Sequence, residues 1–149
     1  MTTRPPIDFG PLDQLVGYQL RRAFLRSNQL FAALAGEAGL APGQYGVLKL
    51  IGLNPGRSQT EIAAAAGLDR SSLTQLLDQI ARAGLVERRP GPDRRTLSLH
   101  LTDEGARTLE AAAGKVAEHE AAIRAGLSPD EAATLAELLR RIHAGPGAA

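Results

Sequence analysis

The sequence contains no cysteine and no tryptophan, and aromatic residues make up only 3% of it. Without cysteine the chain can form no disulfide bond, no thiolate nucleophile and no zinc site built on sulfur ligands. The histidines, His100, His119 and His143, are too scattered for a zinc site, so we expect no metal. No run of about 20 apolar residues is present. The first residues also lack the pattern of a signal peptide, so we expect a cytoplasmic protein without a membrane partner.

Motifs of catalysis and cofactor binding are missing as well. The chain has no GxGxxG, no Walker loop, no HExxH and no GxSxG sequence. The adjacent serines Ser71 and Ser72 have no general base near them in the sequence. We therefore expect neither an enzyme nor a cofactor.

What the chain does contain is enough apolar material for one domain, 44% of 149 residues, with an uneven charge distribution. Residues 88–95 hold four arginines and one acid, whereas residues 103–137 hold eight acids and three bases. A basic loop beside an acidic helical stretch indicates a surface that faces an anion. The alternative is an ordinary solvated turn.

Helical periodicity covers most of the sequence. Apolar residues recur every three or four positions from Leu12 to about Ala38, which predicts one long amphipathic helix. Pro42 suits the first turn of a second helix, which carries Tyr45 inward. Capping residues and glycines mark the limits of the later helices. These are expected at about 59–66, from the cap Asp69 to Ala83, from the cap Thr102 to Gly126, and from the Ser128 capping box through Ile142.

Residues 59–78 have the pattern of a helix-turn-helix. Ala63 is small where the two helices cross, and Gly67 follows where the turn requires a positive φ. Residues 85–88 and 96–101 then alternate like strands around the turn sequence 90–93, which predicts a hairpin. We therefore expect a mainly α fold, with a winged helix-turn-helix lobe whose wing has two or three strands, between long terminal helices.

The expected helix after Asp69 has one apolar face and one hydrogen-bonding face. Gln75 can pair bidentately with adenine, and Thr74 can offer its methyl group to thymine. Arg70, Ser71 and Ser72 are expected to hold phosphates and set the register on DNA. The alternative is that this polar face is merely solvated.

The tip of the hairpin carries Asp93, Arg94 and Arg95. An arginine that enters a narrow minor groove is attracted by its negative potential, which favours A·T-rich flanks. Asp93 could pair with one of the two arginines and orient it. Because the hairpin directly follows the polar helix, both can touch the same duplex.

Residues 40–109 resemble the MarR family of bacterial winged helix-turn-helix transcriptional regulators. The wing motif is the most specific feature, because Asp93-Arg94-Arg95 precedes Leu101-Thr102 at a fixed interval. The other residues that carry the resemblance are Gln44 and Leu48, the segments 58–63, 69–74 and 84–88, and Glu104-Gly105.

The resemblance implies a single MarR-like domain, 1–149, that acts as a homodimeric DNA-binding repressor on a pseudo-palindromic operator. It implies a DNA-binding lobe at 41–102, with the recognition helix, about 69–83, in the major groove and the wing, 88–97, in the minor groove. Helices within 12–38 and 103–143 would form the dimerisation region. The implied DNA contacts are Ser71, Ser72, Thr74, Gln75 and Arg94, with Arg95 structural and Asp93 its orienting partner.

Three positions depart from the family pattern. The wing is one residue shorter than usual before Asp93, which leaves its reach open. Gln75 stands where the family often has arginine, so base preference cannot be transferred. Ala41 replaces the usual serine or threonine cap of the second helix.

Many relatives are released from DNA by small phenolic or carboxylate compounds, by a shift between conformations. Tyr18, Arg22 and Tyr45 are the candidates here, because an arginine near two tyrosines would suit an aromatic acid. The alternative is that Tyr45 is a core residue and Arg22 is solvated. A second alternative concerns the whole protein: a winged-helix module that binds another protein instead of specific DNA.

Overall fold

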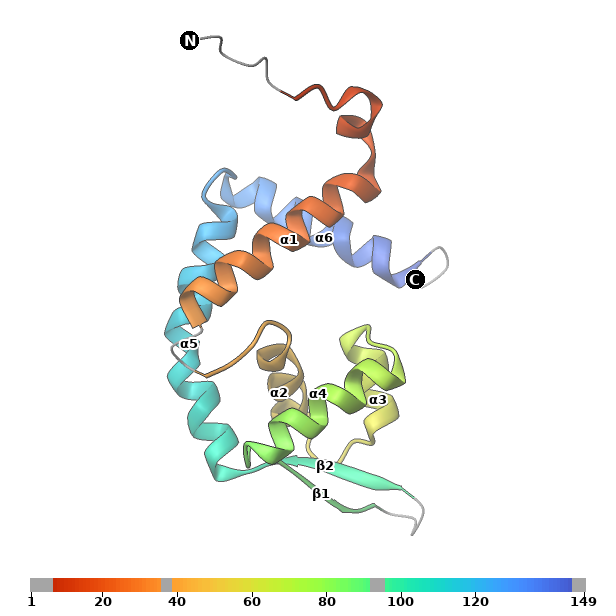
Figure 1. The fold of residues 1–149 in the computed structure, drawn as a ribbon, viewed down its shortest axis with the longest axis vertical. Helices are drawn as coiled ribbons and strands as arrows, with labels where there is room; N and C mark the ends of the chain where they lie inside the picture. The colour runs from red at the N-terminus through yellow and green to blue at the C-terminus, as the bar shows by residue number, and fades with distance from the viewer. Residues whose placement is uncertain (1–6, 36–38, 92–95, 146–149) are drawn as a thin grey trace.

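The computed structural model describes residues 7–35, 39–91 and 96–145. It divides into a helical region at one end and a winged lobe at the other (Figure 1). The helical region consists of α1 (Val16–Ala35), α5 (Asp103–Arg124) and α6 (Pro129–Ala144), preceded by the 3-10 turn η1 (Gly10–Gln14). The winged lobe consists of α2 (Gln44–Leu53), α3 (Gln59–Ala66), α4 (Arg70–Arg82), β1 (Val86–Pro90) and β2 (Leu97–Leu101).

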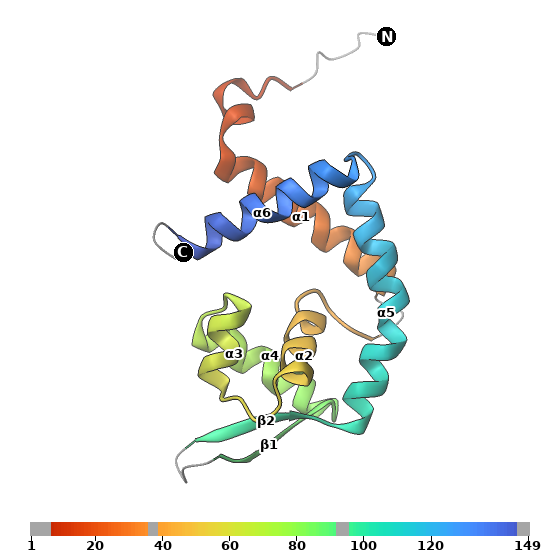
Figure 2. The same ribbon diagram turned by 180° about the vertical axis from the view of Figure 1, so that it is seen from behind.

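The winged lobe has a closed apolar core. Leu48, Ile51, Leu73 and Leu99 have no exposed surface, and they come from α2, α4 and β2. Ala112 of α5 is also fully buried and belongs to the same cluster. The N-terminal half of α5 therefore completes the lobe core, and the helix then runs along one side of the molecule toward α6 (Figure 2).

The helix-turn-helix forms where the local sequence specifies it. Ser58 and Glu61 form a reciprocal capping box at the start of α3. Gly67 ends α3 in the left-handed region, at φ 66°, which a side chain would disfavour. Asp69 then caps α4 by accepting the Ser72 N–H. These three signals confirm the expected helix, turn and second helix.

The wing is a two-stranded antiparallel sheet in which Val86 faces Leu101 and Pro90 faces Leu97. An isolated bridge between Ser58 and Ser98 attaches the start of α3 to β2. Pro90 lacks an N–H group but is tolerated because β1 lies at an edge of the sheet.

The clearest differences from the sequence expectation lie at three boundaries. The first helix does not run unbroken from Leu12, because Leu15 is extended (ψ 117°) and separates η1 from α1. Gln19 donates its side-chain amide to the Asp13 carbonyl across that break, at 2.7 Å. The second helix begins at Gln44 and not near Pro42, since Gly43 has a φ of 87° that α-helical backbone cannot continue through. Strand β1 extends two residues further than expected, to Pro90.

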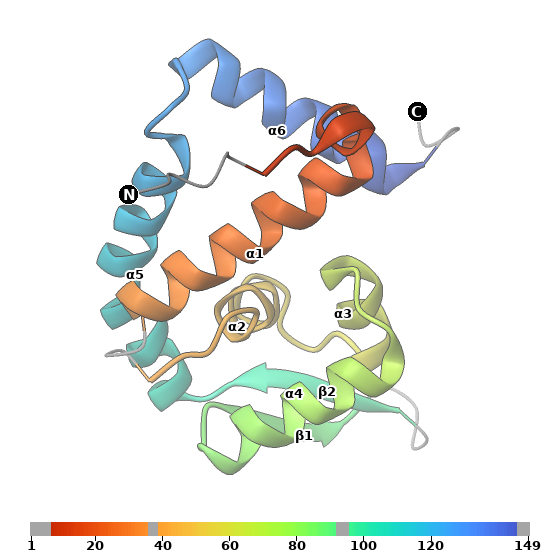
Figure 3. The same cartoon turned by 45° about the horizontal axis from the view of Figure 1, so that its top comes forward.

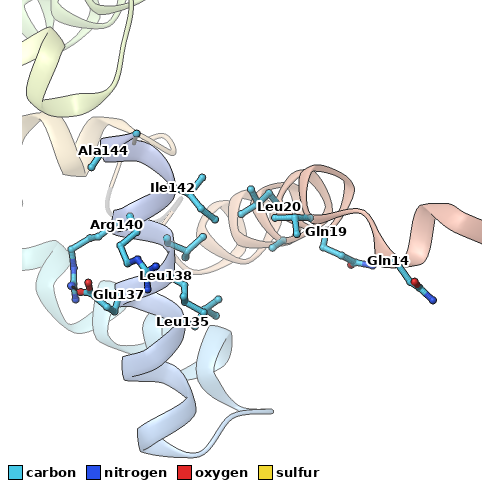
Figure 4. Close-up of a pocket in the computed structure, with 14 residues that line it drawn as sticks. Gln14, Gln19, Leu20, Leu135, Glu137, Leu138, Arg140, Ile142 and Ala144 are labelled. Atoms are coloured by element: carbon cyan, nitrogen blue, oxygen red, sulfur yellow. Dashed lines mark hydrogen bonds and ion pairs between the residues drawn. The ribbon is translucent and has the colours of Figure 1, made fainter. Parts of the chain in front are cut away.

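The helices α1, α5 and α6 form three sides of a triangle (Figure 3). Between α1 and α6 lies an apolar groove of about 1070 Å³. Leu20 of α1 faces Leu135, Leu138 and Ile142 of α6 across it (Figure 4). No residue of α6 is buried. In the described part of the chain, no helix has the length and apolar character needed to cross a bilayer.

Candidate nucleic-acid interface

The first turn of α4 is organised by the carboxylate of Asp69. One oxygen accepts the Ser71 hydroxyl at 2.6 Å and the Ser72 N–H at 2.8 Å. The other oxygen accepts the Ser72 hydroxyl at 2.7 Å. These hydrogen bonds, the one from the Ser71 hydroxyl above all, hold the pKa of Asp69 far below its usual value, so the carboxylate is ionised at neutral pH.

Arg70 and Gln75 project from the same end of α4 and are exposed. Neither side chain makes a hydrogen bond or ion pair with any residue that the structure describes. Their donor and acceptor groups are therefore available to a partner. The N-terminal residues of the second helix are those that reach base edges in helix-turn-helix proteins.

Thr74 is half-buried, and its hydroxyl is engaged on both sides. It donates to the Arg70 carbonyl at 2.7 Å and accepts from the Gln59 side-chain amide at 2.6 Å. The hydroxyl hydrogen of Thr74 is therefore engaged, and the residue can offer a base its methyl group and one remaining lone pair. Sequence reasoning did not identify Gln59, which comes from α3 and fixes this side chain across the turn.

The wing is linked to α4 by an ion pair. Arg88 of β1 donates to Asp78 of α4 at 2.8 Å, and both side chains are partly exposed. The pair adds a polar contact between β1 and α4 to the burial of Val86 and Leu99 in the lobe core. The predicted wing residues Asp93, Arg94 and Arg95 lie outside the described residues.

A second basic residue lies at the start of α3. Arg57 donates to Glu61 at 2.7 Å, and its side chain is exposed at the edge of a cleft of about 520 Å³ between α3 and the wing. The backbone N–H of Ser58, followed by Arg57, lowers the pKa of Glu61 to about 2. Sequence reasoning missed Arg57, although a basic residue directly before a helix cap was a usable signal.

Gln44, the first residue of α2, contacts both the preceding turn and α4. Its side-chain oxygen accepts the Ala41 N–H at 2.9 Å, and its amide donates to Gln79 of α4 at 3.2 Å. The N-cap of α2 is Gly43, which makes no side-chain cap hydrogen bond, so the serine or threonine cap that Ala41 lacks is not replaced.

The three candidate effector residues are not gathered at one point. The guanidinium of Arg22 lies 4.9 Å from the ring centre of Phe9 and 5.9 Å from that of Tyr18. Tyr45, in contrast, is half-buried and packs on the core of the winged lobe. The structure brings Tyr18 and Arg22 together with Phe9, a residue that sequence reasoning did not consider.

Comparison with known proteins identifies the family. A family model described as "MarR family" matches residues 38–96. A protein of Thauera aromatica, to which regulation of the hcr operon is ascribed, is 36% identical over 130 residues, which cover 86% of this chain and 78% of that protein.

Solved structures agree with that match over nearly the whole chain. The transcriptional repressor CouR bound to a 23-mer DNA duplex superposes with a TM-score of 0.85 at 38% identity, covering 93% of this chain and 99% of CouR. CouR bound to p-coumaroyl-CoA gives a TM-score of 0.83 at 37% identity, covering 92% and 97% of the two chains. The chain therefore belongs to the MarR family and is a transcriptional regulator, not an enzyme.

Proposed function

We propose that the protein is a homodimeric repressor that places the start of α4 in the major groove and the wing in the flanking minor groove. The observation that carries the proposal is that the side chains of Arg70 and Gln75, in the first half of α4, are exposed and have no partner among the residues that the structure describes. The likeness to CouR, which has been solved on DNA, supports the same use of this surface. Arg70 holds a phosphate, and Gln75 reads an adenine.

The proposed dimer rests on the unpartnered apolar face of the helical region. Leu138 and Ile142 of α6 are 45% and 53% exposed, and they line the groove against α1. A second copy of the chain would bury this face about a two-fold axis. The two recognition helices would then address half-sites one helical turn apart, roughly 34–36 Å, on a pseudo-palindromic operator.

The proposed effector is a small aromatic compound. CouR, at 37% identity, has been solved with p-coumaroyl-CoA, the thioester of a phenolic acid. In this chain the Arg22 guanidinium lies over the rings of Phe9 and Tyr18, which offers cation and aromatic contacts to such a ligand. Binding that favours a different spacing of the two lobes would release the operator.

The test is selection of DNA from a random duplex pool, followed by titration at several salt concentrations. We expect a two-fold symmetric site whose affinity falls steeply with salt. Gln75→Ala should relax base preference at one position per half-site, while Arg70→Ala should weaken all sequences alike and lower the salt slope by about one per subunit. Arg82→Ala, at the opposite end of the same helix, is the matched control and should leave the selected site unchanged.

The wing is tested by Arg94→Ala. Loss of an arginine from a narrow minor groove should weaken binding to A·T-flanked operators by roughly 1–3 kcal/mol while the dimer stays intact. The measurement is an equilibrium titration on A·T-flanked and G·C-flanked versions of the selected site. Equal loss on both versions would contradict the minor-groove assignment.

One combined result would reject the proposal. A chain that sediments as a single subunit and binds no duplex in preference to random competitor would not be a dimeric repressor. That result would favour the alternative, a winged-helix module for protein contact.

A further inference from the structure

The hydroxyl groups of Ser71 and Ser72 have a fixed polarity. A serine hydroxyl has one hydrogen to donate and two lone pairs to accept with. In both residues that hydrogen points to the Asp69 carboxylate, at oxygen–oxygen distances of 2.6 and 2.7 Å. An ionised carboxylate has no hydrogen of its own, so the direction of donation is unambiguous. Both hydroxyls therefore present only lone pairs to their surroundings.

From this geometry we infer that Ser71 and Ser72 read base edges as hydrogen-bond acceptors and select adenine or cytosine. The inference rests on the proposed function, in which the start of α4 enters the major groove. Adenine and cytosine expose amino groups there, at N6 and N4, whereas guanine and thymine expose only acceptors and a methyl group. A serine hydroxyl that is free to rotate can either donate or accept, so by itself it pairs with either kind of base. Asp69 acts as a positioning residue because it binds the hydroxyl hydrogen and leaves only the acceptor role.

The same geometry makes phosphate a poor partner for these serines. Phosphate oxygens only accept hydrogen bonds, and they would meet the serine lone pairs beside the negative charge of Asp69. Turning a hydroxyl toward a phosphate would break a charge-assisted hydrogen bond, which belongs to the stronger class. Arg70, the adjacent residue, remains the phosphate contact, because its guanidinium carries five donors and has no partner among the described residues.

The competing groups around the carboxylate do not change this assignment. Its remaining partners are backbone N–H groups, that of Ser72 above all, which belong to the helix cap. Thr74, one turn further along, donates its hydroxyl to the Arg70 carbonyl and so does not donate to Asp69. Asp69 is thus left with the two serine hydroxyls as its side-chain donors in the described part of the chain.

The experiment first locates the bases that the serines face. Operator selection is run with the full-length protein, Ser71→Ala and Ser72→Ala, and the positions whose preference changes are identified. At those positions the unmodified protein should prefer adenine or cytosine over guanine or thymine by about 2- to 12-fold, the range of one hydrogen bond.

Base analogues then test the amino group itself. Adenine is replaced by purine, which lacks the 6-amino group, or cytosine by pyrimidin-2-one, which lacks the 4-amino group. The unmodified protein should lose about 2- to 12-fold in affinity, whereas the serine-to-alanine variant should lose nothing further. Comparing the two proteins on the same DNA cancels the effect of the analogue on the duplex.

Asp69→Asn tests the positioning role while keeping a good helix cap. In asparagine an NH₂ group replaces one carboxylate oxygen. A serine hydroxyl that donated to that oxygen must then accept instead, so its own hydrogen becomes free to donate to a base. Guanine or thymine should then be accepted at the position facing that serine. The matched control is Asp103→Asn, which removes the same charge from the first turn of α5 without touching the serines or the wing and should leave the relative preference among the four bases unchanged.

Several outcomes would overturn the inference. Selection of guanine or thymine opposite the serines would do so, as would tight binding to the analogues or unchanged base preference in both serine variants. The proposed function would survive these results, because the protein would still select a symmetric operator. Absence of any sequence preference would instead reject the proposed function and this inference together.

Discussion

The winged lobe and the helical region differ in how completely one chain buries their apolar side chains. In the lobe, leucines from three different elements reach zero exposure, as Leu48, Leu73 and Leu99 do. In the helical region, α1 packs against α5, but α6 contributes no buried residue and Leu138 is 45% exposed. The two regions come from the same chain and have similar apolar content along their helices.

The difference indicates what each region needs for stability. The core of the lobe, with the part of α5 that carries Ala112, is closed within a single chain, so it needs no second copy to bury it. The helical region leaves a contiguous apolar groove whose burial would contribute about 25 cal/mol for each Å² removed from water. Its structure in solution is therefore expected to depend on the second copy that we propose.

The strongest test of this difference between the two regions is the same substitution, leucine to alanine, in each of them. Leu48→Ala should lower the free energy of unfolding of the lobe by about 2–5 kcal/mol, because it leaves a cavity in a closed core. Leu138→Ala should instead weaken dimer association by roughly 1–3 kcal/mol per subunit, because its apolar contact is made with a partner. Urea denaturation at several protein concentrations separates the two effects.

The loss in Leu48→Ala should be the same at every protein concentration. That in Leu138→Ala should be absent at concentrations where neither protein dimerises and should grow to a plateau as concentration rises. A loss in Leu138→Ala that persists where the chain is monomeric would show that α6 is stabilised within its own chain.

A smaller effect is expected at the junction of the two regions, where α5 leaves the lobe. A Cβ atom at Gly105 would overlap the carbonyl oxygen of Leu85 and lie 2.9 Å from Leu101. Gly105→Ala should therefore lower the free energy of unfolding by about 1–3 kcal/mol. Gly114→Ala on the same helix meets open space, so it should raise stability by roughly 0.4–1 kcal/mol.

Thermal or urea unfolding of these two variants gives the comparison directly. If both alanines had the same effect, the close approach of α5 to the lobe would not be what holds the junction.

The smallest expected effect is the pH dependence that Glu61 gives to the lobe. Glu61 has a pKa of about 2 in the folded protein against an ordinary value of 4.5. A lowered folded pKa means that the ionised carboxylate stabilises the fold above pH 4.5, and that this contribution is lost as the pH falls from 4.5 toward 2. Glu61→Gln should flatten the decline of the urea midpoint in that window.

Arg57→Ala, which removes the second of the groups that lower this pKa, should flatten the decline only in part. A midpoint that falls equally steeply in Glu61→Gln would assign the acid sensitivity to other carboxylates.

Local signals determined how much of the lobe could be predicted. Helix α3 and the turn after it were predicted residue for residue, because Ser58, Glu61 and Gly67 specify them within ten positions of sequence. The break at Leu15 and the late start of α2 at Gln44 were not predicted. Apolar periodicity alone does not distinguish a 3-10 turn from the first turn of an α-helix, and it carries no signal for the positive φ of Gly43 that delays the start of α2.

The candidate site shows the same division between local and distant information. The polar face of α4 was readable from the spacing of its residues. The hydrogen bonds that orient it were not, because Gln59 reaches Thr74 across the turn and Gln44 reaches Gln79 over 35 positions. Pairs at such distances depend on how the helices cross, which no local pattern contains. The roles of Asp93, Arg94 and Arg95 stay predictions.

Helix α5 connects the winged lobe to the helical region, so a tilt of this helix moves one region relative to the other. Its N-terminal end is hydrogen-bonded to the lobe, since the N-cap Thr102 donates its hydroxyl to the Gly84 carbonyl and its N–H to the Leu85 carbonyl. Its upper half carries α1, where Phe31 and His119 pack edge to face. A straight helix of 22 residues is about 33 Å long, so a tilt of roughly 5° at one end moves the other by about 3 Å. A small shift of α1 or α6 at one end of α5 can therefore displace the winged lobe, and α4 with it, by about the length of a hydrogen bond.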